Sequence, residues 1–226
     1  MAAGGTDSTS AGAALEELCR AYWYPLYAYA RRRGCSREDA EDLTQGFFAR
    51  FLERNYLEGL SSDRGRFRAF LLAAFNHFLA NEWKREHRQK RGGGEKPLSL
   101  DWNGAATRYE LAPSDRLSPD RLYDRAWVIT LLERVLKHLE SECADDGRGA
   151  FFEHVRSFLT MERGEIPYAA TAAEVGMSEG ALRVAVHRLR RRYRELLRQE
   201  VAQTLSDPGR VEEELAALRS AFSGTN

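Results

Sequence analysis

The sequence predicts an all-α protein with two helical domains. Apolar residues recur at intervals of three and four along most of the 226-residue chain, while the strict alternation of half-buried strands is almost absent. Residues 91–119 interrupt this period, and three consecutive glycines and three prolines make them typical of a linker. We therefore expect a disordered leader at 1–12, a first domain at 13–92, a linker at 93–121, a second domain at 122–205, and a C-terminal amphipathic helix and tail at 206–226.

The helices of the first domain follow from the spacing of their apolar residues. The expected helices cover 13–33, 37–55 and 66–89. In the second of these, Leu43, Phe47 and Phe51 share one face, which is expected to enter a core. The third has a core stripe that starts at Phe67 and continues through Leu71, and it ends in a strongly basic segment.

The second domain is expected to contain helices at 122–142, 148–160, 167–175 and 179–205. A tight turn at Gly176-Met177-Ser178 separates the last two and ends in a residue suited to capping a helix. A final helix at 209–222 follows from the cap at Asp207 and from the three glutamates at 212–214, which favour a helix start. We expect this helix to dock on the preceding domain, with binding of a partner as the alternative.

Composition excludes several classes of protein. No apolar run approaches the roughly 18 residues that span a membrane, so no membrane insertion is expected. The N-terminus lacks the basic start and hydrophobic segment of a signal peptide. Cys19, Cys35 and Cys143 are scattered and form no CxxC pair, which favours buried, reduced thiols and a cytoplasmic location.

The chain has no formal net charge, but its charges are segregated. Residues 183–198 contain seven arginines and one glutamate, and residues 84–91 contain five Lys or Arg and one glutamate. A short helix, a glycine turn and a long helix with an arginine face form the pattern of a helix-turn-helix, whose second helix enters the major groove. A solvated surface helix is the alternative, but such a helix usually mixes charges of both signs. Arg183 and His187 are placed to reach bases, and the later arginines to reach phosphates.

The segment YAATAAEVGMSEGALRVAVHRLRRRYREL resembles the helix-turn-helix of region four in extracytoplasmic-function sigma factors of bacterial RNA polymerase. Tyr168, Gly176, Ser178, Arg183 and His187 fall in the register of that pattern. The resemblance implies contacts to the minus-thirty-five promoter element from Ser178, Glu179, Arg183, His187, Arg188 and Arg191.

The first domain resembles region two of the same family. DAEDLTQGFF, residues 39–48, is similar to the family's signature for binding core polymerase. The resemblance implies that Asp39, Asp42, Gln45 and Phe48 contact the clamp helices of the largest polymerase subunit. GRFRAFL and the residues after it resemble the promoter-melting segment, which implies minus-ten contacts from Arg64, Arg66, Asn76, Asn81, Trp83, Lys84, Arg85 and Arg88. Interleaved aromatic and basic residues also suit unpaired bases, and Trp83 is the best candidate for stacking.

The implied function is that of a sigma factor in a divergent branch of the family, because the connection at 140–166 is longer than usual. The implied partners are core RNA polymerase, through its clamp helices and flap, promoter DNA, and an anti-sigma factor or another regulator. Two other classes stay open. One is a dimeric helix-turn-helix regulator that binds duplex DNA alone, and the other is an adaptor that sequesters polymerase without using Arg183.

No enzymatic, metal or cofactor chemistry is expected. His77, Glu82 and His87 are spaced by five residues, so they spread around a helix and cannot share a metal ion. In the glycine run GGGEK the lysine is not followed by serine or threonine, and no strand precedes the run, so it does not match a phosphate-binding loop.

Overall fold

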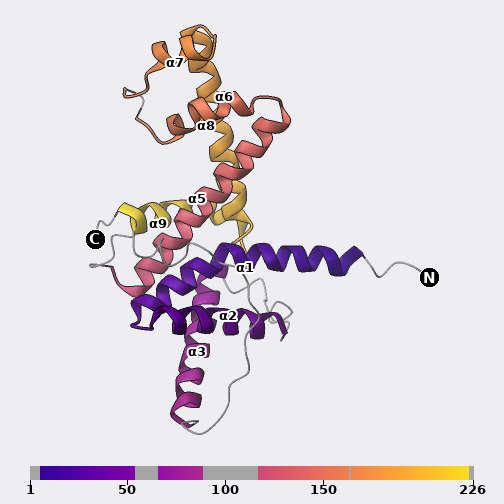
Figure 1. Cartoon of the computed structure of the whole chain (residues 1–226), viewed down its shortest axis with the longest axis vertical. Coiled ribbons are helices and arrows are strands. Elements are labelled where there is room, and N and C mark those ends of the chain that lie inside the picture. Colours follow the sequence, from indigo (N-terminus) through magenta and orange to yellow (C-terminus); the bar gives the residue numbers. More distant parts are fainter. Residues whose placement is uncertain (1–5, 54–65, 89–116, 163, 224–226) are drawn as a thin grey trace, which may run out of the picture. The chain divides into compact units, whose positions relative to one another are not determined.

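The computed structural model describes residues 6–53, 66–88, 117–162 and 164–223. These residues form helices and no β-strand, so the prediction of an all-α protein is confirmed. The helices are α1 (Thr6–Arg32), α2 (Arg37–Glu53), α3 (Phe67–Arg88), α5 (Pro119–Asp145), α6 (Gly149–Val155), α7 (Tyr168–Glu174), α8 (Glu179–Ala202) and α9 (Val211–Ser223), with short 3-10 turns η2 (Arg156–Leu159) and η3 (Pro208–Arg210) (Figure 1).

The chain divides into two compact units, but not at the predicted boundaries. The first unit contains the residues up to Thr130 and the C-terminal residues from Thr204, and the second contains Leu131–Gln203. The division therefore falls inside α5 and not in the segment 93–121, of which 93–116 lies outside the described residues. The reason is that the first turns of α5 bury two large aromatic side chains, Tyr123 and Trp127, in the core of the first unit.

The core of the first unit is rich in aromatic side chains. Between residues 19 and 30, every side chain of α1 except Arg20 is buried, as is typical of a helix enclosed on all sides. Phe47 of α2 lies against Phe75 of α3 with ring centroids 5.1 Å apart and the rings nearly perpendicular. Such edge-to-face pairs add to the free energy that burial alone contributes. The predicted core positions Phe47 and Phe51 are confirmed as buried.

The helix α1 begins earlier than predicted. Residues 6–12 were expected to belong to a disordered leader, but they form the first turns of α1. Adding a turn to an existing helix costs much less than nucleating one, and the buried part of α1 supplies the nucleus. The prediction is wrong for these residues, and residues 1–5 lie outside the described part of the chain.

The C-terminal segment is part of the first unit. The backbone N–H of Phe67 donates to the carbonyl oxygen of Thr204 at 3.1 Å, and Arg66 forms an isolated antiparallel bridge with Leu205. The C-terminal helix was expected to dock on the domain at 122–205, whereas the residues from Thr204 onward belong to the first unit, where they pair with the start of α3. The expected start of a helix near Asp207 is correct, because its side chain accepts from the N–H of Gly209 at 2.9 Å.

A buried group of charges fixes α9 within this unit. Arg68 is 6% exposed and forms ion pairs with Asp124 of α5 and, at 2.7 Å, with Glu214 of α9. Its guanidinium also lies over the ring of Trp127, 5.5 Å from the centroid. Because Arg68 contacts both neighbouring helices, it joins α3, α5 and α9 at one point.

The second unit has its own continuous apolar core. Val135 and Leu139 from α5 pack with Phe152 of α6 and with Leu182 and Val186 of α8. Two ion pairs border this core: Arg192 with Glu142, and Arg134 with Glu200 at 3.3 Å. The hydrogen bonds from Arg192 lower the pKa of Glu142.

The described helices include none with the length and apolar character needed to cross a bilayer.

Candidate nucleic-acid interface

The turn between α7 and α8 has the geometry of a helix-turn-helix. The helix α7 ends with Gly176 in the left-handed region, at a φ of 67°. The N–H of Met177 donates to the carbonyl of Ala172 at 2.9 Å, and the N–H of Gly176 donates to that of Ala173 at 3.4 Å. These two bonds form a Schellman motif, which satisfies the last carbonyls of the helix and reverses the chain.

Ser178 starts α8 as its N-cap. Its backbone is extended, and its hydroxyl oxygen accepts from the N–H of Ala181 at 3.2 Å. This bond satisfies one of the amide groups that the first turn of a helix leaves without a partner. Ser178 was predicted to contact DNA, and the structure gives it this capping role on an exposed part of the turn.

The two faces of α8 differ sharply. Leu182, Val186 and Leu189 are at most 6% exposed and face the core, as the spacing predicted. On the opposite face, the exposed basic side chains and histidine include His187, Arg188, Arg191, Arg194 and Arg198. The residues predicted to contact the minus-thirty-five element are all exposed: Ser178, Glu179, Arg183, His187, Arg188 and Arg191. The helix therefore presents a basic surface of about three turns.

Arg183 is held in place by two neighbours. Its Nε and Nη2 atoms donate to Glu179 Oε1 at 3.0 and 2.6 Å. Its guanidinium lies over the ring of Tyr168 at the start of α7, 4.3 Å from the centroid. Because two of five donors are used, the others are left for a ligand. Glu179, also predicted to contact DNA, is thus an orienting partner of Arg183.

Arg190 does not belong to the exposed basic surface. Its guanidinium donates from Nε to the carbonyl oxygen of Phe158 at 2.8 Å, and also bonds to the carbonyl of Met161. Phe158 lies in η2 and Met161 follows it, so Arg190 satisfies acceptors that the end of a helical turn leaves open. The spacing had placed Arg190 among the phosphate contacts, but the structure shows that it closes a loop of its own unit.

A groove runs along this side of α8. It is lined by Leu159, Met161, Tyr168, Arg183, Val186, His187, Arg190, Tyr193 and Arg194. Apolar side chains and basic side chains both contribute to it, and burial raises the pKa of Tyr193. Arg183 and His187 thus stand between this groove and the basic surface of the helix.

The residues predicted to bind polymerase do not all share one accessible surface. Asp39 and Asp42 are exposed and Gln45 is half-buried. The side chain of Asp39 accepts from the hydroxyl of Ser36 at 2.8 Å, so it helps to begin α2. Phe48 is 3% exposed, with its ring 5.5 Å from that of Phe47. The prediction that Phe48 is a surface contact is therefore wrong, because it belongs to the core.

The predicted minus-ten residues also separate into groups. Asn81, Trp83, Lys84 and Arg85 are exposed near the end of α3, and Trp83 is 50% exposed. Arg85 pairs with Glu82 at 3.1 Å. Four of the eight predicted residues thus form an exposed aromatic and basic surface at one end of one helix.

Asn76 is already used inside the first unit. Its amide oxygen accepts from the hydroxyl of Tyr29 at 2.8 Å and from Arg33 at 3.4 Å. It is half-buried in the middle of α3, away from the exposed end of that helix. The prediction that Asn76 contacts DNA conflicts with this role, which joins α3 to α1.

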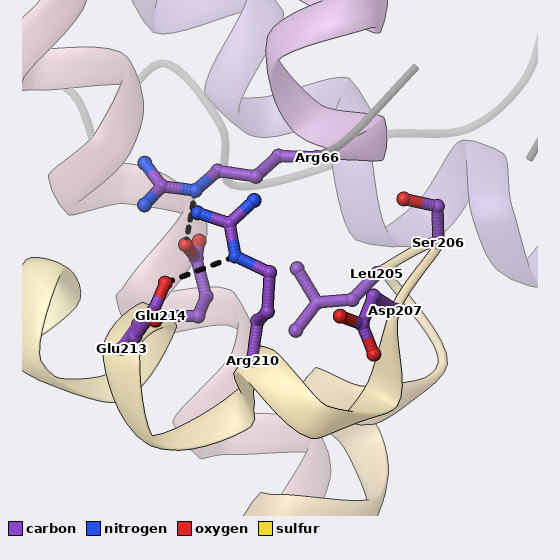
Figure 2. A pocket seen from close by; sticks show the side chains of 7 residues that line it. All are labelled: Arg66, Leu205, Ser206, Asp207, Arg210, Glu213 and Glu214. Carbon is purple, nitrogen blue, oxygen red and sulfur yellow. Dashed lines mark hydrogen bonds and ion pairs between the residues drawn. The ribbon is translucent and has the colours of Figure 1, made fainter. Parts of the chain in front are cut away.

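Arg66 lies in a small pocket of the first unit. Figure 2 shows its side chain above Glu214, with Arg210 and Glu213 beside them. Arg66 Nε is 2.5 Å from Glu214 Oε2, and Arg210 pairs with Glu213 at 2.9 Å. Arg66 is thus engaged by α9, which argues against its predicted role in binding DNA. Arg64 lies outside the described residues, as does the side chain of Arg88.

One exposed residue of the α8 surface, Val184, is not among the residues predicted from the sequence. Among the described residues, Trp83 and Val184 are the large apolar side chains that are exposed. Val184 is 52% exposed. A helical wheel places it among the arginines, which is the signal that could have identified it.

Among the described residues, no three His, Cys, Asp or Glu side chains gather closely enough to hold a metal ion.

Comparisons with protein-family models, curated proteins and solved structures return no match to this chain. The resemblance to sigma factors therefore rests on the motifs of the sequence alone.

Proposed function

We propose that this protein is a sigma factor, which directs core RNA polymerase to specific promoters. The observation that carries the proposal is the exposed basic face of α8, the second helix of a helix-turn-helix that Ser178 caps. A helix presented in this way fits the major groove, where side chains at its start reach base edges and later arginines reach phosphates. Arg183, oriented by Glu179 and Tyr168, is the proposed base contact.

The first unit supplies the features that separate a sigma factor from an ordinary regulator. Asp42 is exposed near the start of α2, and Gln45 is half-buried one turn later. These two residues are the proposed contacts to polymerase. At the end of α3, the ring of Trp83 is half exposed, and Lys84 and Arg85, the next residues in the sequence, are exposed as well. A ring next to cations suits an unpaired base and its phosphate, which an opened promoter provides.

Run-off transcription tests the proposal. Purified bacterial core polymerase is given a fragmented genomic DNA library, with and without the protein, and the new transcript ends are mapped. The proposal predicts discrete new start sites that require the protein. Arg183→Ala should reduce them roughly fivefold or more, because one good base contact is worth about 1–3 kcal/mol. Arg156→Ala is the matched control, since Arg156 is exposed in the same unit but lies outside α8.

A second pair of variants tests the polymerase surface. The double variant Asp42→Ala, Gln45→Ala should lose transcription and binding to core polymerase, while its affinity for duplex DNA should not change. Glu38→Ala, an exposed residue in the first turn of the same helix, is the control. A protein that yields no new start sites, yet shifts duplex DNA by itself as a symmetric dimer, would be a stand-alone regulator, and the proposal would be wrong.

A further inference from the structure

Val184 does not follow the burial pattern of the other large apolar residues of α8. The remaining large apolar side chains of this helix are buried or half-buried, whereas Val184 is 52% exposed. Single exposed valines are common on protein surfaces and carry no meaning alone. The surroundings of Val184 are what give it a meaning.

Val184 lies in the middle of the exposed basic face. At 100° per residue it falls between His187 on one side and Arg188 on the other, and Arg191 follows two turns later on the same line. All three of these side chains are exposed. An apolar side chain with an arginine on either side fits a surface that is negative at its edges and apolar at one point.

The helix can approach such a surface closely at this point. Gly180 precedes Val184 by one turn and has no side chain, and an added Cβ there would meet no atom within 4 Å. Ala181, also exposed, adds only a methyl group. The first turn of α8 is therefore narrow on the side where Val184 projects.

We propose that Val184 is a specificity-determining residue that packs against the 5-methyl group of a thymine in the major groove. This inference rests on the proposed function of α8 as the helix that binds promoter DNA. The thymine methyl is the one apolar group that the major groove displays, and apolar side chains recognise it. The phosphates on both sides of the groove match the arginines on both sides of Val184. A partner protein is disfavoured as the occupant, because few surfaces offer an apolar point within so much negative charge.

The contact can be tested by removing one methyl group at a time. In a promoter fragment obtained by run-off transcription, each thymine of the upstream element is replaced by uracil, and transcription by polymerase with the protein is measured. With the wild-type protein, one replacement should reduce transcription about fourfold, the loss expected for one buried methyl group. Val184→Ala should be weaker on the thymine promoter, and the uracil at that position should have no further effect on it.

Two further variants make the result specific. Val184→Ile should keep the sensitivity to the methyl group, while Gln199→Ala, an exposed residue further along α8, should behave as the wild type. The inference is overturned if no thymine shows sensitivity, or if Val184→Ala remains as sensitive as the wild-type protein. If polymerase gives no new start sites but the protein shifts duplex DNA alone, the same replacements are scanned on that duplex by gel shift. The sigma-factor proposal would then fail while Val184 is still tested, and a protein that binds no duplex overturns both.

Discussion

At the scale of single residues, adjacent arginines on α8 have different roles. Arg190 bonds to the carbonyls of Phe158 and Met161 and is half-buried. Arg191 is 75% exposed and pairs with Glu195, one turn later on the same helix, at 2.9 Å. An exposed pair within one helix contributes little to stability, so Arg191 can exchange its partner for a phosphate. The sequence shows both as arginines of one run, and only the fold distinguishes them.

This difference predicts opposite effects for one type of substitution. Arg190→Gln should destabilise the second unit by about 2 kcal/mol, because it removes charged hydrogen bonds to two carbonyl groups. Arg191→Gln should change the free energy of unfolding by less than about 0.5 kcal/mol, but should lower the salt dependence of duplex binding by about one phosphate contact. Thermal unfolding and binding titrations at several salt concentrations measure the two quantities. Equal destabilisation by both variants would contradict the assignment.

The ion pair between Glu142 and Arg192 predicts a dependence of stability on pH. The hydrogen bonds from Arg192 lower the pKa of Glu142, so this pair stabilises the folded state above the ordinary glutamate pKa and is lost as the pH falls through the lowered value. Between about pH 5 and pH 3, the wild-type protein should lose about 1 kcal/mol more than Glu142→Gln. Hydrogen exchange of residues 182–201, corrected for intrinsic rates, measures this loss.

The control for that experiment is Glu153→Gln, which removes an exposed carboxylate of the same unit that pairs with Arg156. It should keep the wild-type response to acid, because Glu142 is intact. If Glu142→Gln shows the same acid response as the wild-type protein, the ion pair does not stabilise the second unit as described.

At the scale of elements, α9 is held by buried charge. Glu214 is 2% exposed and forms ion pairs with Arg66 and Arg68, so its burial depends on both. Removing one member of such a group leaves an uncompensated charge in the core, which costs about 3–5 kcal/mol. A helix attached in this way is an integral part of its unit and not an independent tail.

Glu214→Gln should therefore destabilise the first unit by at least about 2 kcal/mol. Trp23 and Trp127 are buried in that unit, so urea unfolding followed by tryptophan fluorescence reports on it. Glu212→Gln, an exposed residue of the same turn of α9, should have almost no effect. Equal unfolding midpoints for the two variants would show that α9 is not anchored through Glu214.

The elements themselves could be predicted well from the sequence, and their partners could not. Apolar spacing predicted the helices of both units, and the cap formed by Asp207 predicted the start of the last one. The same spacing could not show that Phe48 is buried or that Glu214 is in the core, since both depend on neighbours distant in the chain. Charge patterns predicted the basic face of α8, but not that Arg190 leaves it, because carbonyl acceptors leave no trace in the sequence.

At the scale of the whole molecule, the proposed function needs surfaces from both units of the chain. The second unit presents the basic face of α8, and the first presents the acidic start of α2 and the exposed end of α3. A regulator needs only the former, whereas a sigma factor needs both at the same promoter. The central claim is therefore that the protein and polymerase together open DNA that neither opens alone.

Permanganate footprinting on one promoter fragment tests this claim most directly, because permanganate oxidises thymines that have become unpaired. The fragment is treated with the protein, with core polymerase, and with both. We expect reactive thymines near the start site only when both are present. Trp83→Ala should abolish this reactivity while binding of the upstream element persists. Reactive thymines with polymerase alone, or protection of the duplex by the protein alone with no opening after polymerase is added, would contradict it.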